Sequence, residues 1–239
     1  MEETEMAIEV GYGHAMQLGE TDHFFSPEDD VVFAGTESSG TMTDGYYAAW
    51  SGQTIQYISD HVGPSLEQRP NIILLAAGTN DMNPNHSISK EGNNPSEAAD
   101  RLGKLIDKMI KECPDAVVLV ALIINTCDPQ QSPRTKEFQQ LIPGVVKNRK
   151  DAGRQVLAVD FTTFETSNLQ DCIHPTNEGY KMMGDYWYDF IHQIPSNWIK
   201  PPVGRDPHGV GGKDNGEIDT PPAWGGNNRE VAGLFKLSW

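Results

Sequence analysis

The sequence has few cysteines and no recognisable metal-binding pattern. Only three cysteines occur among its 239 residues, Cys113, Cys127 and Cys172, and none belongs to a CxxC pair. This is not the pattern of a zinc site or of a disulfide framework. At most one disulfide can form, and the sequence leaves open which two cysteines would pair. The seven histidines include no HxH or HExxH spacing, so we expect no metal site and no cofactor.

Basic residues and long apolar runs are also scarce. Lys and Arg number 18 against 34 Asp and Glu, which gives a formal net charge of −16. A nucleic-acid backbone or an anionic membrane would repel such a chain, so we expect neither as a partner. No apolar run is long enough to span a bilayer. The sequence does not define the oligomeric state.

Short apolar runs alternate with helical periodicity. Runs rich in Val, Ile and Leu without polar alternation are typical of parallel strands that are covered on both faces. They occupy residues 31–35, 72–77, 117–124 and 156–160. Helical spacing covers residues 55–66, 98–110 with Ser96 as the expected cap, 134–150 with a possible break at Pro143, and 177–194. Repeated strand–helix units predict a three-layer α/β sandwich with right-handed crossovers.

The chain length suits one α/β domain, which we place at residues 31–200. Residues 1–30 read as an atypical or truncated N-terminal segment, in which 6–10 is a candidate first strand. Residues 201–239 form a polar, Gly- and Pro-rich tail or linker. Its aromatic residues, Trp224, Phe235 and Trp239, either dock on the domain or belong to a disordered arm; both interpretations stay open.

Two groups of polar residues follow predicted strands. Asp171 stands three residues before His174, within reach of its ring in one tight turn, where a carboxylate can orient a general base. The alternative is a helix entry in which Asp171 bonds local N–H groups. Gly78-Thr-Asn80-Asp81 follows the run at 72–77 and offers an amide donor at the edge of the sheet, or simply a turn shaped for the backbone. We expect Asp81 to be structural.

The order of these blocks resembles the SGNH (GDSL-type) serine esterases, most closely their fungal carbohydrate-esterase and lysophospholipase-like branch. The resemblance rests on Gly52, Gly78-Thr-Asn80-Asp81 and Asp171-x-x-His174-Pro, within the segments 31–40, 50–55, 77–82 and 174–180. Together these spaced blocks span roughly residues 30 to 200 and are far more specific than any one of them.

The resemblance implies a flavodoxin-like sandwich with a mainly parallel sheet, and hydrolysis of an acyl ester through an acyl-enzyme. The substrate would be a small-molecule or carbohydrate ester; acetylated carbohydrate and lysophospholipid are both open. His174 would be the general base and Asp171 its orienting partner, while the Gly52 backbone N–H and the Asn80 amide would stabilise the oxyanion. A complete family member is expected to be extracellular, although no secretory signal opens this sequence.

The family's nucleophile is not recognisable. No Gly-Asp-Ser block occurs, and its usual place, after the first strand, falls in a segment where that strand is missing or atypical. Ser38 and Ser51 are poor substitutes, so the nucleophile is left unassigned. The sequence is either amino-terminally truncated or that of a non-catalytic, carbohydrate-binding relative of the same fold. We favour truncation, because the first strand lies inside the sheet in this fold and its loss would leave unpaired backbone groups.

Beside Gly52, Trp50 and Tyr47 either line a substrate cleft or pack in the core.

Overall fold

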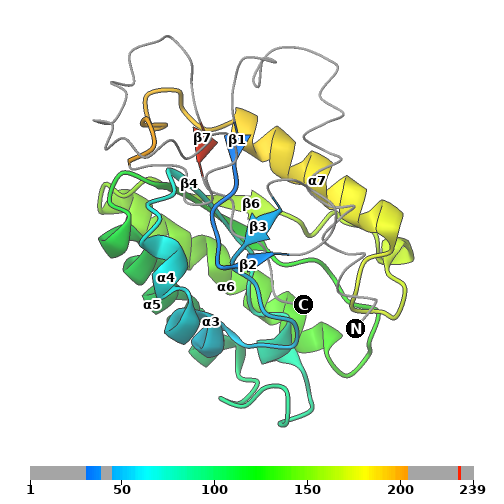
Figure 1. Ribbon diagram of the computed structural model, residues 1–239. Coiled ribbons are helices and arrows are strands. Elements are labelled where there is room, and N and C mark those ends of the chain that lie inside the picture. Colours follow the sequence, from blue (N-terminus) through cyan, green and yellow to red (C-terminus); the bar gives the residue numbers. More distant parts are fainter. Residues whose placement is uncertain (1–30, 39–44, 204–230, 233–239) are drawn as a thin grey trace.

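The computed structural model describes residues 31–38, 45–203 and 231–232 (Figure 1). Its centre is a parallel sheet of three strands in the order β4-β5-β6, formed by Ile72–Leu75, Val117–Leu122 and Val156–Asp160. These strands confirm three of the predicted apolar runs. Two of the runs continue beyond the strand as buried loop: 76–77 after β4 and 123–124 after β5.

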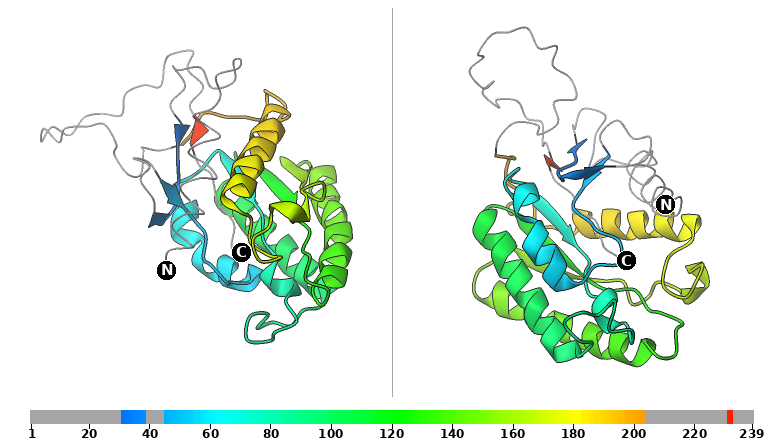
Figure 2. Two further views of the ribbon diagram at one scale, coloured as in Figure 1. Left: turned by 90° about the vertical axis from the view of Figure 1, so that its right-hand side faces the viewer. Right: turned by 60° about the horizontal axis from the view of Figure 1, so that its bottom comes forward.

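Helices cover both faces of this sheet. The α-helices are α3 (Ile55–His61), α4 (Gly63–Leu66), α5 (Pro95–Glu112), α6 (Ser132–Asp151) and α7 (Asn177–His192), with short 3₁₀ helices at Asn80–Met82 (η1) and Thr166–Asn168 (η2). Figure 2 shows α7 on one side of the sheet, with α5 and α6 on the other. Among the described residues, no helix is long and apolar enough to cross a membrane.

Successive residues of β4 and β5 point to opposite faces of the sheet and pack into two separate hydrophobic cores. Ile73, Leu75 and Val118 pack with the side chains of α3 to α6, and their neighbours Ile72 and Leu74 pack with those of α7. All residues of β4 are buried, which explains the absence of polar alternation in its sequence. The predicted three-layer α/β fold is therefore confirmed.

Two predicted helix features are wrong. Ser96 does not cap α5; the side chain of Asn94 accepts the N–H groups of Ser96 and Glu97 instead, and Pro95 takes the first helical position. Pro is favoured there because its missing N–H would have no helical partner. Helix α6 is not broken at Pro143, which lies inside it on the exposed side.

The region 55–66 forms two helices, because α3 ends at His61 and α4 begins at Gly63.

The run at 31–35 forms a much shorter strand than predicted. Only Val31–Val32 is extended and paired (β1), and its parallel neighbour is β7, Val231–Ala232. An antiparallel pair, β2 (Glu37–Ser38) with β3 (Tyr46–Tyr47), follows. Strand β1 therefore has a neighbour from the C-terminal part of the chain. The candidate first strand at 6–10 and the aromatic residues of the tail lie outside the described residues, and the domain boundaries stay predictions.

Candidate functional site

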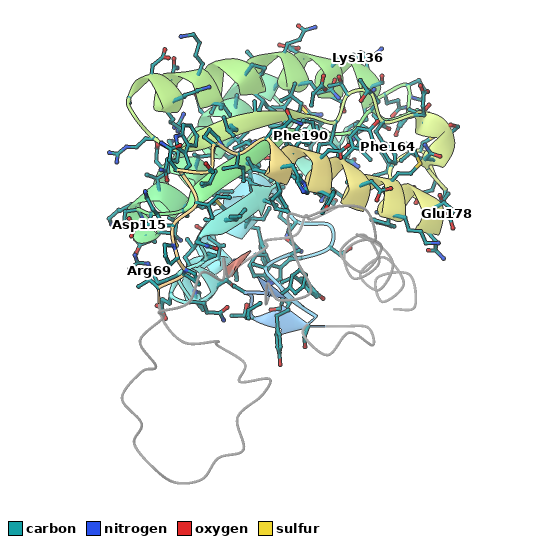
Figure 3. The ribbon with its side chains drawn as sticks, turned by 90° about the horizontal axis from the view of Figure 1, so that it is seen from above. Arg69, Asp115, Lys136, Phe164, Glu178 and Phe190 are labelled. Carbon is teal, nitrogen blue, oxygen red and sulfur yellow. A yellow bond between two sulfur atoms is a disulfide. The ribbon has the colours of Figure 1, made fainter. Side chains whose placement is uncertain are left out.

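The predicted site residues lie on loops at one edge of the parallel sheet. Asn80 follows β4, and Asp171 and His174 follow β6. Carboxyl ends of parallel strands meet at the same edge, where open α/β sheets bind their ligands. Figure 3 shows Glu178, just after this loop, at the opposite end of the molecule from Arg69 and Asp115, which precede β4 and β5.

The loop after β5 links the other two. The side-chain amide of Gln131 donates to the carbonyl of Thr79 at 2.9 Å, and the Thr126 hydroxyl donates to the carbonyl of Cys172 at 2.7 Å. The Asn80 loop and the His174 loop are thus each bonded to residues of one connecting segment. Sequence reasoning did not find Gln131, since a glutamine before a helix carries no distinctive signal.

Asp171 bonds both the ring and the backbone of the histidine turn. One carboxylate oxygen lies 2.6 Å from His174 Nδ1. The other accepts the backbone N–H groups of Ile173 at 3.1 Å and His174 at 2.7 Å. Asp171 therefore bonds the ring with one oxygen and local N–H groups with the other. With Nδ1 facing the carboxylate, Nε2 is the ring nitrogen left to accept a proton.

The electrostatics of the pair favour an ionised carboxylate. Partial burial raises the pKa of Asp171, but the hydrogen bonds from the His174 backbone, the His174 ring and the Ile173 backbone outweigh it, and the pKa lies below its ordinary value. The side chains of His174 and Asp171 remain 39% and 51% exposed, so a substrate can reach the ring.

Backbone bonds close the loop that carries this pair. Gln170 N–H donates to the His174 carbonyl at 2.8 Å, and Thr176 N–H donates to the Asn168 carbonyl at 2.7 Å. The Thr176 side chain then accepts Gly179 N–H and caps α7. Thr176, not Asp171, is therefore the helix entry.

Gly52 and Asn80 are brought together through Gln53. The Asn80 side chain donates one amide hydrogen to the Gln53 carbonyl at 3.0 Å. Gly52, the preceding residue, is exposed and has φ of +72°, which favours glycine. A Cβ built on Gly52 meets no described atom within 4 Å. Within the described residues, the reason for a glycine here is therefore the backbone conformation and not a lack of space.

A buried ion pair fixes the start of α3 to the Asn80 loop. Asp81 is fully buried; one of its oxygens accepts Ile55 N–H at 2.9 Å, and the other accepts Arg101 Nη2 and Nε at 2.9 and 3.2 Å. Burial raises the pKa of Asp81, and the Ile55 N–H and Arg101 oppose this rise. These contacts fit the structural role expected for Asp81. Its partner Arg101 was missed, although its position beside the apolar stripe of α5 was a usable signal.

The structure forms one disulfide, between Cys127 and Cys172. Cys127 lies in the loop after β5, and Cys172 lies between Asp171 and His174. The third cysteine, Cys113, is a buried free thiol whose pKa is raised to about 11 by burial. The pairing had a signal in the sequence, since Cys127 and Cys172 both follow predicted strands at the same edge.

No serine completes a triad in the described part of the chain. Ser51 is exposed beside Gly52, and Ser38 is exposed in β2; neither hydroxyl is bonded to His174. The described residues also contain no group of three His, Cys, Asp or Glu side chains that could hold a metal ion.

Trp50 belongs to a small aromatic cluster along α3. It is partly buried against the core of α3 to α6, and its ring centre lies 6.0 Å from those of Tyr57 and His61. Tyr57 and His61 stack at 3.8 Å. Core packing therefore accounts for part of the Trp50 surface. Tyr47, in β3, is also partly buried.

A three-layer α/β sandwich of this kind, with these loops at its carboxyl edge, has the SGNH hydrolase fold. The model of the GDSL-like Lipase/Acylhydrolase family matches residues 34–182, and the chain belongs to that family.

Individual relatives agree with this assignment. A family 3 carbohydrate esterase from Clostridium thermocellum is 25% identical, with a TM-score of 0.57 over 71% of this chain and 81% of its own. A family 3 carbohydrate esterase from Talaromyces cellulolyticus, 20% identical, shares the fold with a TM-score of 0.58 over 69% of this chain and 82% of its own.

A curated relative, "Putative endoglucanase X" of Acetivibrio thermocellus, is 25% identical over 130 residues, or 52% of this chain. The chain spans about half the length of that relative, 51%.

Proposed function

We propose that this chain comes from an esterase that removes acyl groups from carbohydrate esters by a serine-hydrolase mechanism. The observation that carries the proposal is the Asp171–His174 pair, joined at 2.6 Å and partly exposed at the carboxyl edge of the sheet. Such a pair provides a general base in a fixed tautomer.

In this mechanism His174 Nε2 accepts the proton of a serine hydroxyl as the serine oxygen bonds to the acyl carbon. Asp171 stabilises the imidazolium that results. Collapse of the tetrahedral intermediate breaks the ester C–O bond, and His174 returns the proton to the departing sugar oxygen. Water then releases the acid by the same two steps. The serine itself is not assigned.

Gly52 and Asn80 would bind the developing negative charge. The Gly52 N–H belongs to an exposed turn, and Asn80 uses only one amide hydrogen to bond Gln53, which leaves a second for the oxyanion. A preorganised donor of this kind typically lowers the barrier by about 3 kcal/mol. The bond to Gln53 supports preorganisation, because it holds the amide before substrate arrives.

The relatives favour a carbohydrate ester over a lysophospholipid. The 25% identical solved relative is a carbohydrate esterase, which supports a carbohydrate ester as the substrate class. The Cys127–Cys172 disulfide supports an oxidising, extracellular location, since disulfides persist in such compartments.

The second candidate function is carbohydrate binding without turnover. It is favoured by one observation, the absence of a Gly-Asp-Ser block from the sequence. The two functions use the same site and differ in the nucleophile.

Hydrolysis of p-nitrophenyl acetate and of acetylated xylan separates them. For an esterase we expect saturable turnover by the full-length protein, including any segment that carries the serine, and we expect His174→Ala to lower it at least about 10²-fold. His192→Ala is the matched control, because His192 ends α7, about 22 Å along the helix from its first residue.

A fluorophosphonate probe followed by peptide mapping would identify the reacting serine. Saturable binding of xylo-oligosaccharide by calorimetry, with neither turnover nor labelling, would establish the binding function instead and refute the esterase.

A further inference from the structure

We propose that the Cys127–Cys172 disulfide positions the Asp171–His174 pair, and that only the oxidised chain holds the pair in its working geometry. Cys172 acts through its neighbours and is a positioning residue. The inference rests on the proposed function insofar as it takes this pair to be the catalytic one.

Cys172 is the point at which the histidine turn is fastened to the rest of the fold. Its sulfur is bonded to Cys127, and its carbonyl accepts both the Cys127 N–H at 3.3 Å and the Thr126 hydroxyl at 2.7 Å. All three links come from the loop that follows β5. This strand is the middle strand of the parallel sheet, and its first five residues are buried, so it is a firm support.

Within the described ranges, the other hydrogen bonds of residues 170–174 are internal to the turn. Asp171 bonds Ile173 and His174, and Gln170 bonds the His174 carbonyl. Such bonds define the shape of the turn but do not fix where it lies relative to Asn80 on the neighbouring loop. The link to the β5 loop fixes this position, because Gln131 of the same connecting segment bonds Thr79, next to Asn80.

The turn also contains a backbone conformation that needs support. Cys172 has φ of +70°, a left-handed conformation that residues with a side chain rarely adopt. The Asp171 and His174 side chains are partly exposed, so water competes for their hydrogen bonds. Once the sulfur link is cut, Cys172 can relax to negative φ, and the Asp171 bonds to Ile173 and His174 would be lost with it.

The experiment uses the His174 ring as its reporter and needs no turnover. In ¹⁵N-histidine-labelled protein, the Nδ1–H that faces Asp171 should give a downfield proton signal; His174→Gln identifies it by its loss. Reduction by dithiothreitol transfers two electrons and two protons to the disulfide. We expect the signal to disappear on reduction, and equally in Cys127→Ser and Cys172→Ser, which break the same bond from either side.

Controls separate positioning from unfolding. Cys113→Ser removes the buried free thiol and should leave the signal, and its sensitivity to dithiothreitol, unchanged. Far-UV circular dichroism and the methyl resonances of β4 and β5 report the fold. Loss of the His174 signal with these retained supports the proposal. Persistence of the signal after complete reduction, or its absence from the oxidised protein, refutes it.

Turnover then distinguishes this inference from the proposed function. In an active preparation, cutting the disulfide should lower kcat at least about 10-fold with little change in KM, because the base acts in the chemical step and not in substrate binding. A redox-dependent His174 signal without any turnover by the full-length protein would uphold the inference and refute the esterase. Turnover that is unaffected by reduction would support the esterase and refute the inference about the disulfide.

Discussion

Arg101→Ala should destabilise this fold more than the loss of an exposed helix charge would. The Arg101 side chain is only 11% exposed and gives two donors to Asp81, which is fully buried. The substitution leaves that carboxylate with the single N–H of Ile55 as partner. Removing one member of a buried ion pair typically costs about 3–5 kcal/mol, since the remaining charge has been taken out of water without compensation.

Urea unfolding followed by circular dichroism would measure this cost. With an m-value of about 3 kcal/mol/M, a loss of 3–5 kcal/mol moves the midpoint down by about 1–1.7 M. The matched control is Asp115→Asn, which removes the 3.7 Å ion pair between Arg69 and Asp115, whose side chains are 35% and 57% exposed. Exposed pairs contribute about 0–1 kcal/mol, so its midpoint should hardly move.

A double-mutant cycle tests the reasoning rather than the total. Asp81→Asn keeps an acceptor for Ile55 N–H, and Arg101→Met keeps the stem of the side chain without its charge. If the penalty comes from an uncompensated charge, the double variant should be more stable than the sum of the single losses predicts, by at least about 1.5 kcal/mol. Additive losses, or an Arg101→Ala cost no larger than that of Asp115→Asn, would refute this account of the pair.

Three further outcomes are expected. The folded-state pKa of Asp171 is below the unfolded value of about 3.9, so the carboxylate stabilises the fold above that pH. The difference in free energy of unfolding between the parent protein and Asp171→Asn should therefore shrink as pH falls below about 4. A constant difference would contradict this. Burial raises the pKa of the Cys113 thiol to about 11, so this thiol should not react in the folded protein at pH 8. Titration of the oxidised protein with 5,5′-dithiobis(2-nitrobenzoate) should detect no thiol before denaturation and one after it. Rapid labelling without denaturant would contradict this. Gly78→Ala should lower the free energy of unfolding in urea by about 2–4 kcal/mol, because φ is +121° and the new Cβ would lie 2.3 Å from the Phe138 ring. Gly52→Ala meets only the φ penalty and should cost about 1 kcal/mol. Equal costs would mean that the Phe138 ring moves aside freely.

Apolar patterning was enough to predict the sheet, but not its edges. The runs at 72–77, 117–124 and 156–160 each contain a strand, because buried parallel strands leave an unbroken apolar signature. The run at 31–35 carries the same signature and yields only two paired residues, since strand length there depends on a partner, β7, from the far end of the chain. The predicted cap of α5 was wrong because a second capping residue lay nearby: Asn94 caps the helix, two residues before Ser96.

The contact between Asp171 and His174 was predicted because it is local, whereas the long-range contacts that support it were not predicted. Asp171 and His174 are three residues apart, so one turn decides their bond. Arg101 reaches Asp81 across 20 residues, Gln131 reaches Thr79 across 52, and Cys127 reaches Cys172 across 45. No periodicity encodes such pairings; they exist only once the carboxyl edges of the strands have been brought together.

These supports share a purpose that core packing does not explain. The Asp81–Arg101 pair is costly to bury, and replacing such a pair by apolar side chains is often neutral or favourable for stability. Its position is what distinguishes it, because Asp81 follows Asn80 directly and bonds the first residue of α3, three residues after Gly52. The same holds for the disulfide, which fastens a turn with little apolar surface to bury but with the Asp171–His174 pair on either side of Cys172. A fold that needed only stability would have no reason to fix the two polar loops on either side of the sheet edge by a buried charge and a covalent bond. In the proposed esterase, holding Gly52, Asn80 and His174 in one arrangement would give both features a physical reason.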